Sequence, residues 1–228
     1  MLLNEAEARH ALKVLRLKSG DAVQALDGRG SAWEGALETE GEQVYIRLGE
    51  ACETTEAPVN VTLYMGLPKG EKLELIAQKL TELGAVRLVP VRMERSVAKI
   101  PANEAEKKLS RVRRIAQEAQ KQSGRQMELE ITDPVDFAEL PELMKAHDRC
   151  FLLWEEVRGY RLTDGRADAP DARDIGFIVG PEGGITVREA EKLEQAGAKY
   201  VTLGPRILRA ETAAIAGCAA IMTLWGDL

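Results

Sequence analysis

Cysteine and histidine are scarce in this chain of 228 residues, and both shortages limit its chemistry. Its three cysteines, Cys52, Cys150 and Cys218, lie far apart and form no C-x-x-C pair, and its two histidines are His10 and His147. Zinc sites need clustered thiolate or imidazole ligands, and disulfide frameworks need paired cysteines. The sequence therefore predicts no metal site and no disulfide scaffold, and we interpret both histidines as structural or solvated.

Long hydrophobic runs are missing as well. No apolar stretch approaches the roughly 18–20 residues that cross a bilayer, and the start MLLNEAEARH lacks the basic segment of a signal peptide. We therefore expect a cytoplasmic protein without a membrane partner. Apolar residues still make up 45% of the chain, enough to bury the core of one large domain or two smaller ones.

Several familiar catalytic motifs are also missing. No G-x-G-x-x-G follows a predicted strand at the start of the α/β region, and neither G-x-x-x-x-G-K-[ST] nor G-x-S-x-G occurs. These absences argue against dinucleotide-dependent enzymes, ordinary nucleotide-fold methyltransferases and P-loop ATPases.

Positive charge is in the minority overall but is concentrated in one segment. The 31 basic and 37 acidic side chains give a net charge of -6, which by itself argues against a nucleic-acid partner. Residues 92–125, however, hold ten basic and four acidic side chains and carry +6, which leaves -12 for the rest. This asymmetry predicts a basic patch on an acidic body.

A helix over residues 103–122 is predicted inside this basic segment, with Asn103 and Glu106 as a capping box. One side of it is apolar, with Leu109, Val112, Ile115, Ala116 and Ala119. The other side, if the helix extends far enough, carries Arg111, Arg114, Glu118, Lys121 and Arg125. This stripe is either a solvated face or an RNA-binding surface. Most of these side chains are positively charged, whereas solvated faces usually mix positive and negative charges. This weakens the interpretation as a solvated face.

The chain divides by pattern into a short β module and a longer α/β domain. A helix capped by Asn4 precedes three strand patterns, AVQALD, SAWEGALE and QVYIRL, and the polar stretch 50–58 is the predicted linker. We place the boundary between 1–57 and 58–228. In the second part, strands alternate with helices, and Thr186 and Glu189 form another capping box. This alternation predicts a parallel sheet covered on both faces.

Two segments of the second part do not follow this alternation. Residues 155–174 are rich in Asp, Arg, Gly and Pro, and predict a loop. The last helix, ETAAIAGCAAIMTLW, is apolar almost all round and rich in small residues. It is either a buried core helix or a helix packed at a subunit interface.

Two glycine-containing loops follow predicted strands in the last third of the chain. They are GPEGG at 180–184 and LGPRILRAETA at 203–213. Loops at the carboxyl ends of parallel strands bind ligands in open α/β sheets, and glycines let the main chain approach a ligand closely. Together the two loops predict a ligand site.

Several motifs in order resemble one family. QKLTELG at 78–84, PVRMERSV at 90–97, QSGR at 122–125, both glycine loops and the terminal LWGDL are similar to the 16S rRNA (uracil-N3)-methyltransferase family. That family belongs to the SPOUT class of knotted methyltransferases. The resemblance covers nearly the whole chain, since HALKVLRLKSGDAVQALDGRG resembles the family's PUA-like RNA-binding module.

The resemblance implies a small PUA-like β-barrel followed by an α/β domain with a C-terminal trefoil knot through which the protein forms a homodimer. S-adenosylmethionine is the implied cofactor. The implied target is N3 of one uridine in 16S rRNA, within the small ribosomal subunit. The implied cofactor contacts are Leu153, Trp154, Gly180, Glu182, Gly183, Leu203, Gly204, Ile207, Leu208, Thr212 and Ala213.

The resemblance also directs attention to Arg209 and Glu211 as catalytic residues. Arg209 is suited to stabilise charge on the uracil oxygens, and Glu211 to act as a base or to orient Arg209. The alternative for the pair is an ion pair that only fixes the loop. For RNA contacts we expect Arg95, Arg111, Arg114, Lys121 and Arg125.

Two other functions remain open at this stage. One is a SPOUT methyltransferase that acts on a ribose 2′-hydroxyl or on tRNA. The other is a non-catalytic RNA-binding factor for ribosome assembly, which the two intact loops disfavour. The chain also departs from the family pattern at its start, where Met1 lies close to His10, and this leaves the completeness of the predicted barrel open.

Overall fold

The structure is a computed structural model that describes residues 1–41, 43–97, 102–157 and 159–228. It divides the chain into two compact units, Met1–Glu56 and Ala57–Leu228. The side chain of Asn103 lies outside the described part, and the predicted capping box there stays a prediction. Among the described helices, none combines the length and the apolar character that crossing a bilayer requires.

The N-terminal unit consists of a short helical segment and an antiparallel sheet. Helix α1 (Glu5–Arg9) is capped by Asn4, as predicted, and continues as a π-helical turn, η1 (His10–Val14). The sheet has the strand order β1-β2-β3, with β1 (Ala22–Leu26), β2 (Ala32–Glu40) and β3 (Gln43–Ala51). The first residues of the chain run along β3, where Leu3 donates to the Val44 carbonyl.

A parallel sheet forms the centre of the second unit. Its strand order is β10-β8-β9-β4-β5-β6, with β7 also paired to β5, and the pairings are parallel. The strands are β4 (Asn60–Gly66), β5 (Arg87–Arg92), β6 (Glu130–Ile131), β7 (Val135–Asp136), β8 (Arg149–Leu153), β9 (Asp174–Val179) and β10 (Lys199–Val201). This confirms the predicted fold class. The knot itself stays a prediction.

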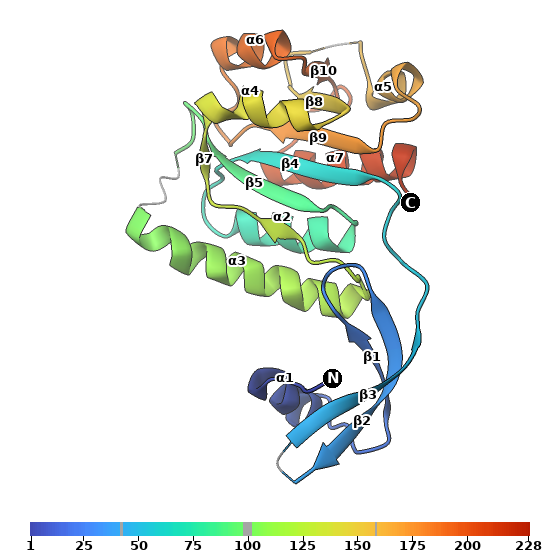
Figure 1. The fold of residues 1–228 in the computed structure, drawn as a ribbon. Coiled ribbons are helices and arrows are strands. Elements are labelled where there is room, and N and C mark those ends of the chain that lie inside the picture. Colours follow the sequence, from blue (N-terminus) through green and yellow to red (C-terminus); the bar gives the residue numbers. More distant parts are fainter. Residues whose placement is uncertain (42, 98–101, 158) are drawn as a thin grey trace. The chain divides into compact units, whose positions relative to one another are not determined.

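Helices cover both faces of this sheet, as the alternation of elements predicted (Figure 1). They are α2 (Lys72–Glu82), α3 (Ala102–Ser123), α4 (Leu140–Leu143) between the 3-10 turns η2 (Phe137–Glu139) and η3 (Met144–Ala146), α5 (Leu162–Asp168), α6 (Val187–Gln195) and α7 (Ala210–Trp225). In β4, Leu63 and Met65 face the core cluster that includes residues of α2 and α7, whereas Tyr64 faces the cluster that includes residues of α4 and α6. The Thr186–Glu189 capping box is formed at the start of α6.

The segment 155–174 contains α5 and is therefore not the continuous loop that its composition predicted. Leu162 is buried in this helix, and a side chain at Gly165 would lie 2.7 Å from the Phe151 ring. A short helix at the edge of a core buries few side chains, so its sequence can be mostly polar. The composition of this segment therefore did not indicate a helix.

Helix α7 packs against the sheet and α2 along one stripe. Ala214, Cys218 and Ile221 are fully buried in the core, while Thr212 and Thr223 are exposed. The buried stripe shows a core helix. A role of its other side in subunit contacts stays a prediction.

Candidate functional site

The two glycine loops lie at the carboxyl ends of β9 and β10, and both lie beside the N-terminal end of α7. Two adjoining cavities open there. The smaller, of about 60 Å³, is lined by 201–208 together with Leu153, Trp154, Glu155 and Ala213. The larger, of about 370 Å³, is lined by Lys72, the GPEGG loop except Gly183, and the start of α7. The two share Leu153, Glu155, Ile207, Leu208 and Ala213, and so form one continuous site.

Most of the residues that were expected to contact the cofactor line this site. Those that line it are Leu153, Trp154, Gly180, Glu182, Leu203, Gly204, Ile207, Leu208 and Ala213. Gly183 and Thr212 line neither cavity. The Gly183 carbonyl accepts a hydrogen bond from Arg95, and Thr212 is exposed on the first turn of α7.

Close packing fixes the GPEGG loop at the end of the sheet. A side chain at Gly66, the last residue of β4, would lie 2.4 Å from Pro181, and one at Gly180 would lie 2.6 Å from Ile185. Gly184 has φ +75°, which side chains rarely tolerate. These glycines therefore hold the loop tightly against β4, and its backbone forms a firm wall of the site.

Trp154, which lines the smaller cavity, has an unsatisfied hydrogen-bond donor. Its indole Nε1 is buried and has no hydrogen-bond partner among the described residues. Buried donors are almost always paired in folded proteins. A ligand with an acceptor group would satisfy this one, so the residues present fit a polar cofactor.

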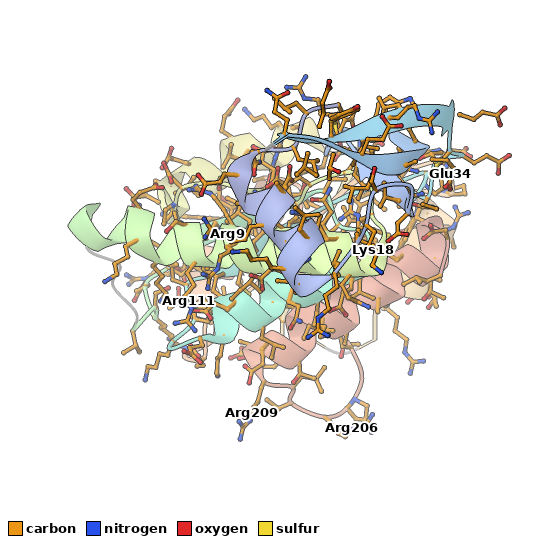
Figure 2. The ribbon with its side chains drawn as sticks, turned by 90° about the horizontal axis from the view of Figure 1, so that it is seen from below. Arg9, Lys18, Glu34, Arg111, Arg206 and Arg209 are labelled. Carbon is orange, nitrogen blue, oxygen red and sulfur yellow. The ribbon has the colours of Figure 1, made fainter. Side chains whose placement is uncertain are left out.

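Arg209 and Glu211 do not form the ion pair that was one interpretation of their spacing. Figure 2 shows the Arg209 side chain, like that of Arg206, directed away from the loop before α7. Glu211 instead lies 3.0 Å from the ammonium of Lys72, measured from Oε2 to Nζ, and Arg209 has no ion pair in the described part of the chain. The interpretation as an Arg209–Glu211 loop clamp is therefore wrong.

Lys72 is a member of the site that the sequence did not indicate. Its Nζ atom also lies 2.9 Å from Oε1 of Glu182, in the GPEGG loop. These two carboxylates, Glu182 more than Glu211, raise the pKa of Lys72. Burial acts to raise the pKa of Glu211, but its own backbone amide and Lys72 outweigh this effect, and the pKa is lowered. A carboxylate held charged in this way is a weak base.

The predicted basic stripe is only partly available for RNA. Arg114 and Lys121 are exposed on α3, and Arg114 has a loose contact of 3.8 Å with Glu118. The Arg111 guanidinium lies 3.0 Å from a carboxylate oxygen of Glu71 and 3.0 Å from one of Glu74. A surface arginine that already pairs with carboxylates gains less binding free energy from a contact with an RNA phosphate.

Arg125 does not belong to this stripe, contrary to prediction. Helix α3 ends at Ser123, and Gly124 turns the chain with φ +75°. Arg125 is therefore only 5% exposed, and its guanidinium donates to the carbonyls of Thr81 and Ala85. It holds the end of α2 and cannot reach RNA.

Arg95 connects the basic segment to the site. It follows β5, is exposed, and donates from Nη1 to the Gly183 carbonyl at 3.2 Å. The neighbouring Glu94 amide donates to Glu189 at the start of α6. These two contacts fix the residues after β5 beside the GPEGG loop, and they bring one of the predicted RNA contacts to the edge of the site.

Nothing in the described part of the chain resembles a metal site, and all three cysteines are free thiols. Burial raises the pKa of Cys150 and of Cys218 to about 12 in each case. Neither of these two thiols is therefore poised as a nucleophile.

Comparison with known proteins identifies two matching families. Residues 55–222 match a family model described as an RNA methyltransferase domain, and residues 3–49 match an RNA methyltransferase PUA domain. Ribosomal RNA small subunit methyltransferase E of Bacillus subtilis is 34% identical over 225 residues, 94% of this chain and 86% of the relative. The enzyme of that name from Synechocystis is 34% identical over 97% of this chain and 72% of the relative.

A solved structure is similar over the same extent. The Ribosomal RNA small subunit methyltransferase E of Neisseria gonorrhoeae, bound to S-adenosyl methionine, superposes with a TM-score of 0.90 and 33% identity, over 100% of this chain and 93% of that one. The similarity therefore includes both units.

Proposed function

Because the chain belongs to the RNA methyltransferase family, we propose that it transfers a methyl group from S-adenosylmethionine to N3 of one uridine in 16S rRNA. The main support is structural: the two glycine loops form one continuous site, and the unpaired Arg209 lies at its edge. Relatives named for small-subunit rRNA, similar over nearly the whole chain, support the choice of substrate.

The cofactor supplies an electrophilic methyl group when bound. Leu153, Trp154, Gly204 and Leu208 would hold it from the side of the smaller cavity, and Glu182 from the side of the larger one. Apolar walls and exposed backbone groups suit an adenosine, and the Trp154 indole supplies a donor. Gly180, Leu203, Ile207 and Ala213 would complete the walls.

Arg209 has the properties that methylation at N3 needs. The N3 atom of uracil carries a proton, which must pass to water when the methyl group is transferred, and its loss leaves negative charge on the flanking carbonyl oxygens. An exposed guanidinium without a carboxylate partner can donate to these oxygens and stabilise that charge. Since Glu211 is bound to Lys72 and has a lowered pKa, we assign it to positioning and not to proton removal.

RNA binding is proposed for the exposed members of the basic segment and for the N-terminal module. Arg95 lies beside the GPEGG loop, and Arg114 and Lys121 lie on α3. Residues 1–57 would add contacts of the PUA-like module, and 58–228 would form the catalytic domain. We further propose a knotted homodimer that acts in the cytoplasm on the small ribosomal subunit.

The test uses small subunits from cells that lack the gene. Purified protein and S-adenosylmethionine are added, and the 16S rRNA is copied by reverse transcriptase. Methylation at N3 blocks the Watson–Crick edge, so one new stop is expected, together with N3-methyluridine in a nucleoside digest. A 2′-O-methylated nucleoside, methylation of tRNA alone, or binding without transfer would each refute the proposal in favour of another function.

A further inference from the structure

One ammonium group joins three separate parts of the site. Lys72 opens α2, Glu182 lies in the loop after β9, and Glu211 lies in the first turn of α7. The ammonium lies 2.9 Å from Glu182 and 3.0 Å from Glu211, and the three side chains are 29%, 25% and 14% exposed. The Lys69 amide also donates to Glu182, at 3.0 Å. The contacts tie the GPEGG loop and the start of α7 to α2.

The position of Glu211 matters because of Arg209, two residues earlier. Arg209 occupies the N-cap of α7, and its positive charge is one of the smaller causes that lower the pKa of Glu211. Without Lys72, the Glu182 and Glu211 carboxylates would lose the cation that they share, and Arg209 is the other cation that lines the larger cavity. Like charges repel and an unpaired carboxylate attracts the guanidinium.

We propose that Lys72 is a positioning residue that binds Glu182 and Glu211 and thereby keeps the Arg209 guanidinium unpaired and available to the substrate. This inference rests on the proposed function for its catalytic consequence, because Arg209 has a role only if charge develops on the substrate. Its structural part, that Arg209 would replace Lys72 as the partner of Glu211, is independent of the reaction and rests on the two Lys72 contacts and on the Arg209 charge that acts on Glu211.

The charge states of the cluster support this arrangement over a wide pH range. The pKa of Lys72 is raised from its ordinary 10.5, so its contribution is fully present below that value and is lost only as the pH rises further. Burial acts to raise the pKa of Glu182, but Lys72 and backbone amides outweigh it, and this pKa, like that of Glu211, lies below its ordinary 4.5. The carboxylate contribution is thus present above 4.5 and is lost as the pH falls further. The cluster is intact at neutral pH.

The test is a set of four full-length variants: K72M, E211Q, K72M/E211Q and, as the matched control on the same helix, K79M. Lys79 pairs with Glu82 and lies away from the site. We expect K72M to lower kcat by about 10- to 100-fold and to change the Kd for S-adenosylmethionine by about threefold or less. Removing the Glu211 charge as well should restore much of the lost kcat, and K79M should behave like wild type.

The double variant separates positioning from other roles. If K72M/E211Q is as slow as K72M, Lys72 does not act through Glu211 and the proposal is wrong. It is equally wrong if K72M loses cofactor affinity in proportion to kcat, since Lys72 would then be a binding residue. K72R should keep most of the activity because an arginine can reach both carboxylates, and thermal unfolding shows whether each variant is folded.

A crystal structure of K72M tests the inference without activity. The Arg209 guanidinium is expected within ion-pair distance of Glu211, and an unpaired Arg209 would overturn the proposal. If wild-type protein transfers no methyl group to small subunits while K72M shows the new ion pair, the proposed function fails and the competition for Glu211 stands.

Discussion

Arg209 is the residue on which the proposed chemistry depends most. It is exposed, has no carboxylate partner in the described chain, and lines the larger cavity. We expect R209A to lower kcat by about 10²–10³-fold, the effect of removing one donor to a developing oxyanion, and to leave cofactor affinity nearly unchanged. Single-turnover rates and calorimetric titration with S-adenosylmethionine measure the two quantities.

The matched control is R188A, which removes an exposed arginine on α6 outside both cavities of the site. It should keep wild-type rates. Equal losses of turnover and cofactor affinity in R209A would show that Arg209 only shapes the loop.

The three cysteines differ in their surroundings, and their reactivity should differ accordingly. Cys150 is 6% exposed and Cys218 is fully buried, and burial raises both pKa values to about 12. Thiolates are the species that alkylate, so near pH 8 both thiols should resist iodoacetamide while the half-buried Cys52 reacts. Peptide mass spectrometry of folded and urea-unfolded protein gives the pattern. Fast modification of Cys150 or Cys218 in folded protein would contradict the structure.

At the scale of elements, periodicity was sufficient for the longer strands and the long helices, but it missed β6 and β7, which have two residues each. Helix α3 extends over Ala102–Ser123 against a predicted 103–122, because Leu109, Val112 and Ala116 recur on one buried side. The same periodicity could not show where the helix ends. The chain turns at Gly124, and Arg125, which we predicted on the surface, is therefore buried.

The sequence predicted the two loops of the site, but not which charged side chains pair within it. GPEGG and LGPRILRAETA follow strands, and the carboxyl ends of parallel strands share one edge. Lys72 lies more than a hundred residues before Glu182 and Glu211, and no local pattern indicates which of several lysines reaches them. Side-chain pairing between distant segments depends on three-dimensional positions, which local spacing does not give.

Helix α3 should dominate the salt dependence of RNA binding. Each phosphate contact by a basic side chain contributes about 0.7–0.9 to the slope of log K against log salt concentration. Because Arg114 and Lys121 are exposed, R114E/K121E should lower this slope by about two such contacts, or more if the introduced acids repel phosphates. Filter binding to small subunits at several salt concentrations measures it.

A charge reversal elsewhere provides the control for this slope. Lys145 lies in η3, next to α4, and pairs with Glu142. K145E changes the net charge in the same direction and should leave the slope close to that of wild type. A slope that R114E/K121E does not change would reject α3 as the RNA-binding surface.

At the scale of the whole molecule, the net charge of -6 is compatible with RNA binding only if the basic surface is local. Residues 1–55 contain six basic and ten acidic side chains, so the N-terminal unit contributes little electrostatic attraction. It has its own small core around Leu37 and Ile46, separate from the two clusters of the second unit. The RNA binding that we propose for this unit would then come from shape and from specific contacts.

Removal of this unit should therefore change target recognition more than salt dependence. A chain of residues 57–228 contains every residue that lines the two cavities of the site, and we expect it to bind S-adenosylmethionine with unchanged affinity. Its KM for small subunits should rise by tenfold or more, on the order of the 1–3 kcal/mol that a few specific contacts contribute, while the salt slope stays near that of the full chain. Kinetics over a range of salt concentrations measure both. A large fall in the slope would instead assign the phosphate contacts to the N-terminal unit, and lost cofactor binding would show that the second unit needs the first in order to fold.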